Sequence, residues 1–454
     1  MRPPAAAVPR GQLLVLSRDI SAGAVVLAVT LPVVFLHVRF QPSVALGPVT
    51  FKLSDALVLL TALTAAATVV RRGFAPLRAG LPVWATGVAL FLWIGAAVFY
   101  PLLSSGAYPW RTHLVTAGEF AEYALLAPAV PLLIRRRADA LLTLGTLVGW
   151  SIVATIVGVL QWSGWNIAAG WGQGHREPSL LGTQDFAAFS AMTLGLGIVS
   201  LLWGVRDRLR IAAWTAVVTG LIGFVLGGAT SGVIGLVPAV AIAGSVAARR
   251  GLVRRAALAG AVVATALASL GVVVYRSGDF GQFFSFLGVK QASTAATTHV
   301  ETYPQHTLLA YIGLRIWLHH PIVGAGFEAS KDYATFGREL PAAHARFPHV
   351  APMSFPNATR IYGVQDIYVQ TLADLGIVGL LLLLALFGAG IWPALSTALR
   401  GPPGDGFAAL LGVVWLVLSL GFLTAQGIIA GIPLDAVMWL GFGAAVTRPR
   451  AGVD

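Results

Sequence analysis

The chain has 454 residues, of which 57% are hydrophobic and only 11% are charged, and its mean hydropathy is +0.80. Soluble domains carry roughly 25% charged residues, so this composition excludes an ordinary soluble protein and indicates a polytopic membrane protein. The net charge of +12 is explained by arginine-rich loops and contact with anionic membrane lipids, so a nucleic-acid partner is not expected. The sequence contains no cysteine, which excludes disulfides and thiol chemistry.

Apolar runs of about 18 to 25 residues, long enough to cross a hydrocarbon core, recur along the chain. They predict an all-α membrane protein with about twelve transmembrane helices, the first of which is a retained helix rather than a cleaved signal peptide. The predicted spans are 20–38, 51–70, 81–100, 119–134, 140–160, 183–204, 211–228, 231–248, 256–275, 365–392, 407–425 and 431–447. We accordingly divide the chain into helices one to nine (1–275), a large loop (276–363) and helices ten to twelve (364–454).

Arginine clusters fall in alternate loops when the N-terminus is placed in the cytoplasm, as the positive-inside rule requires. Examples are the triplet at 135–137 and the pairs at 249–250 and 254–255. This orientation predicts a multi-pass protein of the cytoplasmic membrane and places all nine histidines on the outer side or at its interface. A site that handles protons or anions is therefore expected on the outer face.

Two outer segments, 161–182 and 276–363, are much longer than the other connections, and long loops tend to be either functional or disordered. The second contains Trp317, Phe327 and Phe336 among its aromatic residues, which argues against disorder over its whole length. We expect it to fold over the helix bundle as an ordered lid, with short helices at 306–319 and 328–340.

Arg315 lies in "YIGLRIWLHHPIVGAGFEAS", where a predicted helical turn ends at "HHP" and "GAG" forms a tight turn. A guanidinium at this position can clamp a phosphate through two hydrogen bonds, which a lysine does less well. The alternative is a lone interfacial arginine that pairs with lipid head groups. The glycines of "GAG" can bring backbone amides to an anion, although G-x-G alone is a weak signal.

The helix that follows the large loop begins with the polar residues Gln365, Asp366, Gln370 and Asp374 in "QDIYVQTLADLG". Polar groups stacked below an outer loop predict the lining of a polar cavity. The alternative for Asp366 is a helix N-cap, but capping does not explain Asp374, a carboxylate that is costly to bury without a partner.

A second Gln-Asp pair, Gln184 and Asp185, stands at the outer mouth of the predicted helix 183–204, after Arg176. No internal repeat is evident that would relate the two pairs.

At these residues the sequence resembles the O-antigen ligase and O-antigen polymerase superfamily, over roughly 170 to 385. The strongest match is "LRIWLHHPIVGAGFEAS" followed by "QDIYVQTLADLGIVGLL". Members show a His-Asn or similar pair, nine residues and G-x-x-G; here Gln365 and Asp366 stand at the pair, and Gly376 and Gly379 supply the glycines. "GTQDFAAF" resembles the family's "G.f.NpN.lA.f", and "GGATSGVIGL" resembles "l..SRg...l" but lacks its arginine.

The resemblance implies a glycosyltransferase on the outer face of the cytoplasmic membrane that uses neither a metal nor a cofactor. Its donor is expected to be an oligosaccharide on undecaprenyl diphosphate, and its acceptor a lipid-linked or surface-anchored glycan. Arg315 is the first choice for binding the diphosphate, with Arg176 and possible contributions from Arg338, Arg346 and Arg360. Polymerase and ligase activities stay open.

The family's histidine, taken to be the base that activates the acceptor hydroxyl, is replaced by Gln365, whose amide cannot accept a proton. Asp366 beside it is the first alternative for the base, and His344 and His349 are the second. Asp185 is the third alternative. The acceptor cavity is expected to include Gln184, Asp185, Gln370 and Asp374.

Two other functions compete with the enzyme. One is a transporter or flippase for a lipid-linked or anionic substrate, although transporters usually place their binding groups at the membrane midplane between internal repeats. The other is an inactive relative that scaffolds the glycan machinery, which the missing histidine and arginine favour.

Overall fold

The computed structural model describes residues 20–46, 49–103, 108–165, 167, 176–252, 254–278, 302–348, 350–428 and 432–448. These residues are almost entirely helical, with one β-hairpin, β1 (Ser43–Leu46) and β2 (Val49–Lys52), between the first two helices. The helices are α1 (Ala22–Val34), α2 (Leu53–Arg72), α3 (Leu81–Phe99), α4 (Trp110–Ala124), α5 (Leu126–Leu133), α6 (Arg137–Trp162), α7 (Thr183–Leu202), α8 (Asp207–Gly227), α9 (Thr230–Arg249), α10 (Arg255–Tyr275), α12 (Thr302–His319), α13 (Tyr333–Phe336), α14 (Leu340–Arg346), α15 (Ile367–Arg400), α16 (Pro403–Phe422) and α17 (Ile432–Val446).

Among the described residues, nine helical segments are long and apolar enough to cross a membrane, which indicates a multi-pass membrane protein. They correspond to nine of the predicted spans and include α2, α3, α6 to α10, α15 and α16. Many of their apolar side chains are exposed, as expected of surfaces that face lipid rather than water.

The other three predicted spans do not form single helices of spanning length. The spans at 20–38 and 431–447 contain α1 and α17, which have 13 and 15 residues. The span at 119–134 is divided between α4 and α5, with α4 ending at Ala124. Pro128 explains this division, because a proline lacks the N–H that would bond to the carbonyl four residues earlier and its ring clashes with that carbonyl.

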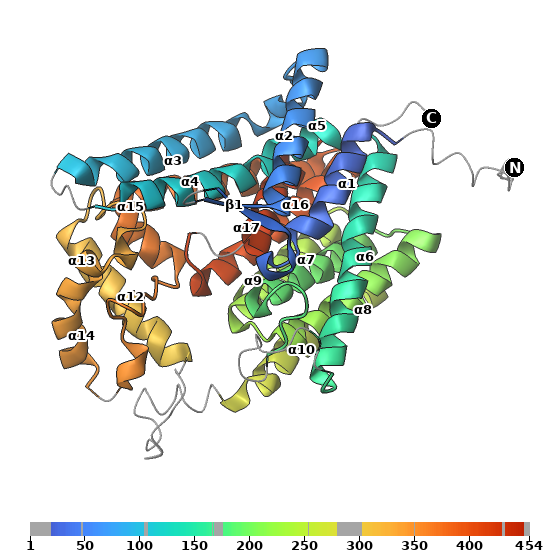
Figure 1. Cartoon of the computed structure of the whole chain (residues 1–454). Coiled ribbons are helices and arrows are strands. Elements are labelled where there is room, and N and C mark those ends of the chain that lie inside the picture. The colour runs from blue at the N-terminus through green and yellow to red at the C-terminus, as the bar shows by residue number, and fades with distance from the viewer. Residues whose placement is uncertain are drawn as a thin grey trace, which may run out of the picture.

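Helix α7 lies at the centre of the bundle, where it packs against α8, α9, α16 and α17 (Figure 1). Nearly all of its residues from Phe186 onward are buried. Glycines allow the close approach of α8, since a Cβ on Gly220 would lie 2.5 Å from the Leu194 amide nitrogen and one on Gly197 2.7 Å from the Ala213 carbonyl oxygen. Helix α7 is therefore tightly packed along its length, which fixes the position of the residues at its N-terminal end.

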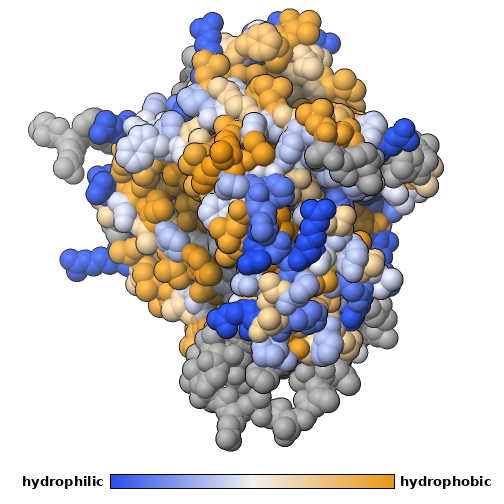
Figure 2. Space-filling view, turned by 90° about the vertical axis from the view of Figure 1, so that its left-hand side faces the viewer, coloured by the Kyte–Doolittle hydropathy of each residue, from blue (hydrophilic) through white to orange (hydrophobic). Residues whose placement is uncertain are grey.

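The described part of the large loop packs as a separate layer beside the N-terminal part of α15, on the left of Figure 1. Seen from that side, hydrophilic residues gather at the centre and lower right of the view, and hydrophobic residues lie mainly above and to the left of them (Figure 2). Leu308, Ile312 and Phe336 belong to a small hydrophobic cluster that also includes Ala373 of α15, so the described part of the loop packs against this helix. The expected helix at 306–319 is present as α12.

The prediction of a second helix in the loop, at 328–340, is wrong. That stretch forms a 3₁₀ turn (Ala329–Lys331), the four-residue α13 and a second 3₁₀ turn (Gly337–Glu339), and α14 begins only at Leu340. Glu328 adopts a left-handed conformation with φ of 62°, which a continuous α-helix cannot include.

Candidate functional site

Helix α15 is broken at Gly376, where φ is 67° and ψ is −170°. The turn made by "PIVGAG" fills the break: the amides of Ala325 and Gly326 donate to the carbonyls of Ala373 (2.8 Å) and Asp374 (3.0 Å). The amides of the "GAG" turn therefore bind the protein's own backbone, and the interpretation that they bind an anion is wrong. Only glycine adopts this conformation readily, so Gly376 is needed where loop and helix meet.

Four polar side chains tie the loop to the helix, and we call them the polar latch: Glu328, Lys331, Gln370 and Asp374. The Gln370 Nε2 donates to Glu328 Oε1 at 2.9 Å and to Asp374 Oδ2 at 3.1 Å, while its Oε1 accepts from the Ile428 amide at 2.7 Å. Asp374 Oδ1 accepts from the Ser330 amide at 2.7 Å, and Lys331 pairs with Glu328. Gln370 and Asp374 are fully buried, so in this structure they join the loop to α15.

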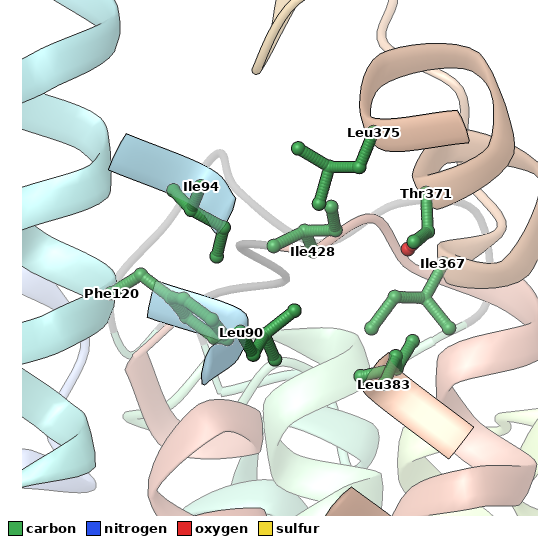
Figure 3. A pocket seen from close by; sticks show the side chains of 8 residues that line it. All are labelled: Leu90, Ile94, Phe120, Ile367, Thr371, Leu375, Leu383 and Ile428. Atoms are coloured by element: carbon green, nitrogen blue, oxygen red, sulfur yellow. The ribbon is translucent and has the colours of Figure 1, made fainter. Parts of the chain in front are cut away.

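The hollow beside these turns of α15 is apolar. Figure 3 shows side chains from α3, α4 and α15, together with Ile428, pointing into it. Its lining is Leu90, Ile94, Phe120, Ile367, Thr371, Leu375, Leu383 and Ile428. Gln370 and Asp374, which we expected to line a polar acceptor cavity, do not belong to this lining.

A second polar group lies around the C-terminal ends of α8 and α10, and we call it the cationic cluster: Arg176, Arg276 and, from the first turns of α12, His306. The two arginines are 8% and 7% exposed. Arg176 Nε donates to the Gly227 carbonyl at 2.8 Å, and Arg276 Nη1 donates to the Gly228 carbonyl at 2.9 Å. A Cβ on Gly228 would lie 3.4 Å from carbon atoms of both arginine side chains, so the two stems flank this glycine.

The C-terminus of α8 explains why two arginines gather there. The last carbonyls of a helix lack intrahelical partners and carry partial negative charge, which cations satisfy. Gly228 ends the helix in the left-handed conformation, with φ of 59°, and this turn exposes the carbonyls of Gly227 and Gly228. Glu177 contributes one carboxylate to the surroundings.

His306 joins the cationic cluster from the first turns of α12. Burial lowers the pKa of His306, a hydrogen bond to the Gln365 backbone raises it, and the charges of Arg176 and Arg276 lower it further. The net shift is downward, so the imidazole is neutral near pH 7. Gln365 thus contacts a histidine through its backbone.

Arg315, the first choice for the diphosphate, is not part of this cluster. Its Nε donates to Glu339 at 2.9 Å, and 38% of its side chain is exposed. It lies nine positions beyond His306 on α12, which places it about 13 Å further along the helix and on the opposite face. His319 shares Glu339 at 3.3 Å. The structure therefore places Arg176 with Arg276 and leaves Arg315 apart.

The remaining predicted arginines also lie away from the cluster. Arg338 and Arg346 are exposed, and Arg346 lies over the Phe347 ring at 5.7 Å. Arg360 Nη1 donates to the Met353 carbonyl at 3.3 Å. None of these contacts connects them to Arg176.

The candidate bases are dispersed. Asp366 is the N-cap of α15, and its Oδ1 accepts from the amides of Tyr368 and Val369 at 2.9 and 3.0 Å. His344 is exposed and stacks on Phe355, with ring centroids 3.9 Å apart. His349 lies outside the described residues.

Asp185 and Gln184 start α7 at the same end of the bundle as Arg176. Asp185 accepts a hydrogen bond from the Leu434 backbone in α17. Its Oδ1 and the Gln184 Oε1 are buried without a hydrogen-bond donor. These two oxygens are acceptors that the fold itself does not satisfy.

Sequence reasoning missed His306 and Arg276 as site residues. Both lie in the large outer segment, and the outer position of every histidine was the only signal that included His306. No group of three or more metal-ligating side chains occurs among the described residues. No protein-family model matches the chain, and no curated protein matches it.

Proposed function

We propose that this protein is a glycosyltransferase of the O-antigen ligase or polymerase type, which transfers oligosaccharide from undecaprenyl diphosphate to a glycan or lipid-linked acceptor outside the cytoplasmic membrane. The observation that carries the proposal is the cationic cluster. Two buried guanidiniums are held at the C-terminal ends of α8 and α10, within electrostatic range of a histidine from α12, and such an arrangement suits a diphosphate.

The chemistry needs fixed positive charge. When the bond between the anomeric carbon and the diphosphate oxygen breaks, negative charge develops on the leaving group, and preorganised cations stabilise that charge. Arg176 and Arg276 are held in place by the carbonyls of Gly227 and Gly228. They therefore require little reorganisation when the bond breaks.

We also propose where the polyprenyl chain of the donor lies. Val273 and Val274 lie in the last turn of α10, three and two residues before Arg276, and are 43% and 63% exposed. In a membrane such surfaces face lipid. A polyprenyl chain lying along this face of α10 would bring its diphosphate to Arg276 from within the bilayer.

His306 supports the leaving group rather than the acceptor in this proposal. It lies beside the arginines, and in a single displacement the attacking hydroxyl must approach from the side opposite the diphosphate. A neutral imidazole next to two cations becomes a good hydrogen-bond donor or proton carrier once an anion neutralises them.

The test is donor consumption by purified protein in nanodiscs, supplied with polyprenyl-diphosphate-linked oligosaccharides, with released polyprenyl diphosphate as the readout. Arg276→Ala should lower the rate by about 10²- to 10³-fold, as expected for loss of a charge that stabilises the leaving group. Arg276→Lys should recover part of the activity, because it keeps the charge and loses the fork geometry.

Arg315→Ala is the matched control, since it also removes an arginine from the large outer segment. We expect it to keep activity within about threefold, because an exposed ion pair contributes little. Loss of activity in Arg315→Ala with full activity in Arg276→Ala would move the diphosphate site to Arg315. A wild-type protein that releases no polyprenyl diphosphate from any donor would contradict the enzyme.

A flippase is the second candidate, and the broken helix α15 favours it, because transporters often build binding sites at discontinuous helices. Against this, the break at Gly376 is filled by backbone hydrogen bonds from the 321–326 turn. The same nanodisc preparation separates the two functions, since a flippase moves the intact lipid-linked glycan across the bilayer without releasing polyprenyl diphosphate.

A further inference from the structure

The mouth of α7 holds an unsatisfied carboxylate. One oxygen of Asp185 receives a backbone hydrogen bond from Leu434 at the start of α17, whereas its Oδ1 is buried and has no donor in the structure. The neighbouring Gln184 Oε1 is also buried and has no hydrogen-bond donor in the structure. Leaving a buried acceptor unpaired costs about 1–3 kcal/mol and more for a charged group, so a fold that keeps two of them together suits a ligand that donates hydrogen bonds.

The support beneath Asp185 is rigid. Gly182, with φ of 114°, turns the chain into α7, and the Gly182 amide donates to the Pro178 carbonyl at 2.9 Å. Ser179 is fixed by its Oγ on the Ala154 carbonyl at 2.6 Å and by its amide on Gln161 Oε1 at 2.7 Å. These hydrogen bonds hold the backbone of the short segment between Arg176, in the cationic cluster, and Asp185.

We infer that Asp185 is the general base that takes the proton from the acceptor hydroxyl, with Gln184 orienting that hydroxyl. The inference rests on the proposed function and names the acceptor side of the same site. The acceptor oxygen forms a bond to the anomeric carbon, the bond from that carbon to the diphosphate oxygen breaks, polyprenyl diphosphate leaves toward the cationic cluster, and the hydroxyl proton moves to Asp185.

The other acidic candidates already form hydrogen bonds within the protein. Asp366 Oδ1 caps α15 with two hydrogen bonds, and both oxygens of Asp374 accept hydrogen bonds within the polar latch. His306 lies among the arginines on the leaving-group side. Among the carboxylates that the sequence selected as site residues, Asp185 is the one with a buried oxygen that has no donor.

The key variant is Asp185→Asn, because an amide oxygen can still accept from Leu434 but cannot take a proton at useful pH. Two acceptors are compared in nanodiscs: an oligosaccharide hydroxyl, which must lose a proton, and azide, which attacks the anomeric carbon without losing one. We expect transfer to the hydroxyl to fall by about 10²- to 10⁴-fold, and glycosyl azide formation to stay within about threefold of wild type, because the anion needs no base.

Asp405→Asn is the control, since Asp405 lies in the first turn of α16, near the C-terminal end of α7 where Trp203 packs against Gly406. It should leave both reactions unchanged. Equal loss of hydroxyl and azide transfer in Asp185→Asn would mean a structural role, and full hydroxyl transfer would place the base elsewhere; either result overturns the inference. Failure of the proposed function is distinct, because then the wild type consumes no donor with either acceptor.

Discussion

The polar latch and the cationic cluster differ in what their charged side chains contact. In the latch, the carboxylates of Glu328 and Asp374 bond to Lys331, to the Gln370 side chain and to the Ser330 amide. In the cationic cluster, two buried guanidiniums bond to the backbone carbonyls at the end of α8, and their charges act on His306. Side chains that bond across two segments hold a fold together, whereas buried cations fixed on backbone carbonyls at one place are candidates for acting on an anion.

The comparison reverses the expectation drawn from the sequence. Gln370 and Asp374 attract attention because they are polar residues in an apolar helix, yet their contacts are all explained by the loop that packs on them. Arg276 and His306 do not stand out in the sequence, yet in the fold the charge of Arg276 acts on His306. Rarity of a residue type in its segment is therefore a weaker guide to function than the balance of its contacts.

Disrupting the junction of loop and α15 at Gly376, beside the polar latch, should have the largest effect on stability. Gly376→Ala places a side chain in a conformation that only glycine adopts readily, and its Cβ would collide with the Ile322 carbonyl. We expect a loss of about 3 kcal/mol or more, seen as a lower apparent melting temperature in detergent and poor recovery of folded protein.

Gly388→Ala is the control within the same helix, because a Cβ there meets no atom within 4 Å. It should be neutral or stabilising by up to about 1 kcal/mol, as alanine favours the helix. A stable Gly376→Ala protein would show that α15 can straighten, and would strengthen the flippase as an alternative.

The affinity of the cationic cluster for the donor should depend on pH. In the free protein, burial and the charges of Arg176 and Arg276 hold the pKa of His306 below 6.5. A bound diphosphate adds negative charge and raises that pKa. A group whose pKa rises on binding takes up a proton, so donor affinity should increase as pH falls through the raised pKa and level off below the free value, by at most about tenfold per pH unit.

The measurement is the affinity for a short-chain prenyl diphosphate sugar, a diester whose phosphates do not titrate in this range, between pH 5.5 and 8. His306→Gln should flatten the dependence. His320→Gln is the control, because burial, His319 and Arg338 also lower the pKa of His320, but it lies beyond the far end of α12. A dependence that survives in His306→Gln would remove His306 from the diphosphate site.

What could be predicted from the sequence was local. Apolar runs identify the spanning helices because each run buries or exposes its own surface, and the position of Asp366 before Ile367 indicates a helix cap. The division of the predicted span 119–134 was not foreseen, although Pro128 within it explains the division. The break at Gly376 was not predictable, because a glycine in an apolar helix is common and this one is decided by a turn some fifty residues earlier, at 321–326.

The candidate site was predicted only in part for the same reason. Arg176 and the Gln184–Asp185 pair were selected by their predicted place at an outer mouth, and the structure puts them before and at the start of α7. His306 and Arg276 were missed, because their contacts with Gln365 and Gly228 join segments far apart in sequence. Such contacts depend on the tertiary fold, which no periodicity encodes.

The smallest expected effect concerns Asp366. A catalytic role and a structural role of this residue predict opposite turnover for its asparagine variant. Its Oδ1 accepts from two backbone amides, and burial raises its pKa while those amides lower it. Asp366→Ala should cost about 1 kcal/mol of stability, since alanine cannot cap a helix, and Asp366→Asn should cost almost none, since asparagine caps about as well as aspartate. Donor turnover at pH 6 to 8 should remain within about twofold in the asparagine variant, because a capping oxygen takes no proton from the acceptor. If turnover in Asp366→Asn collapses while the melting temperature holds, the base is at α15 and the assignment to Asp185 is wrong.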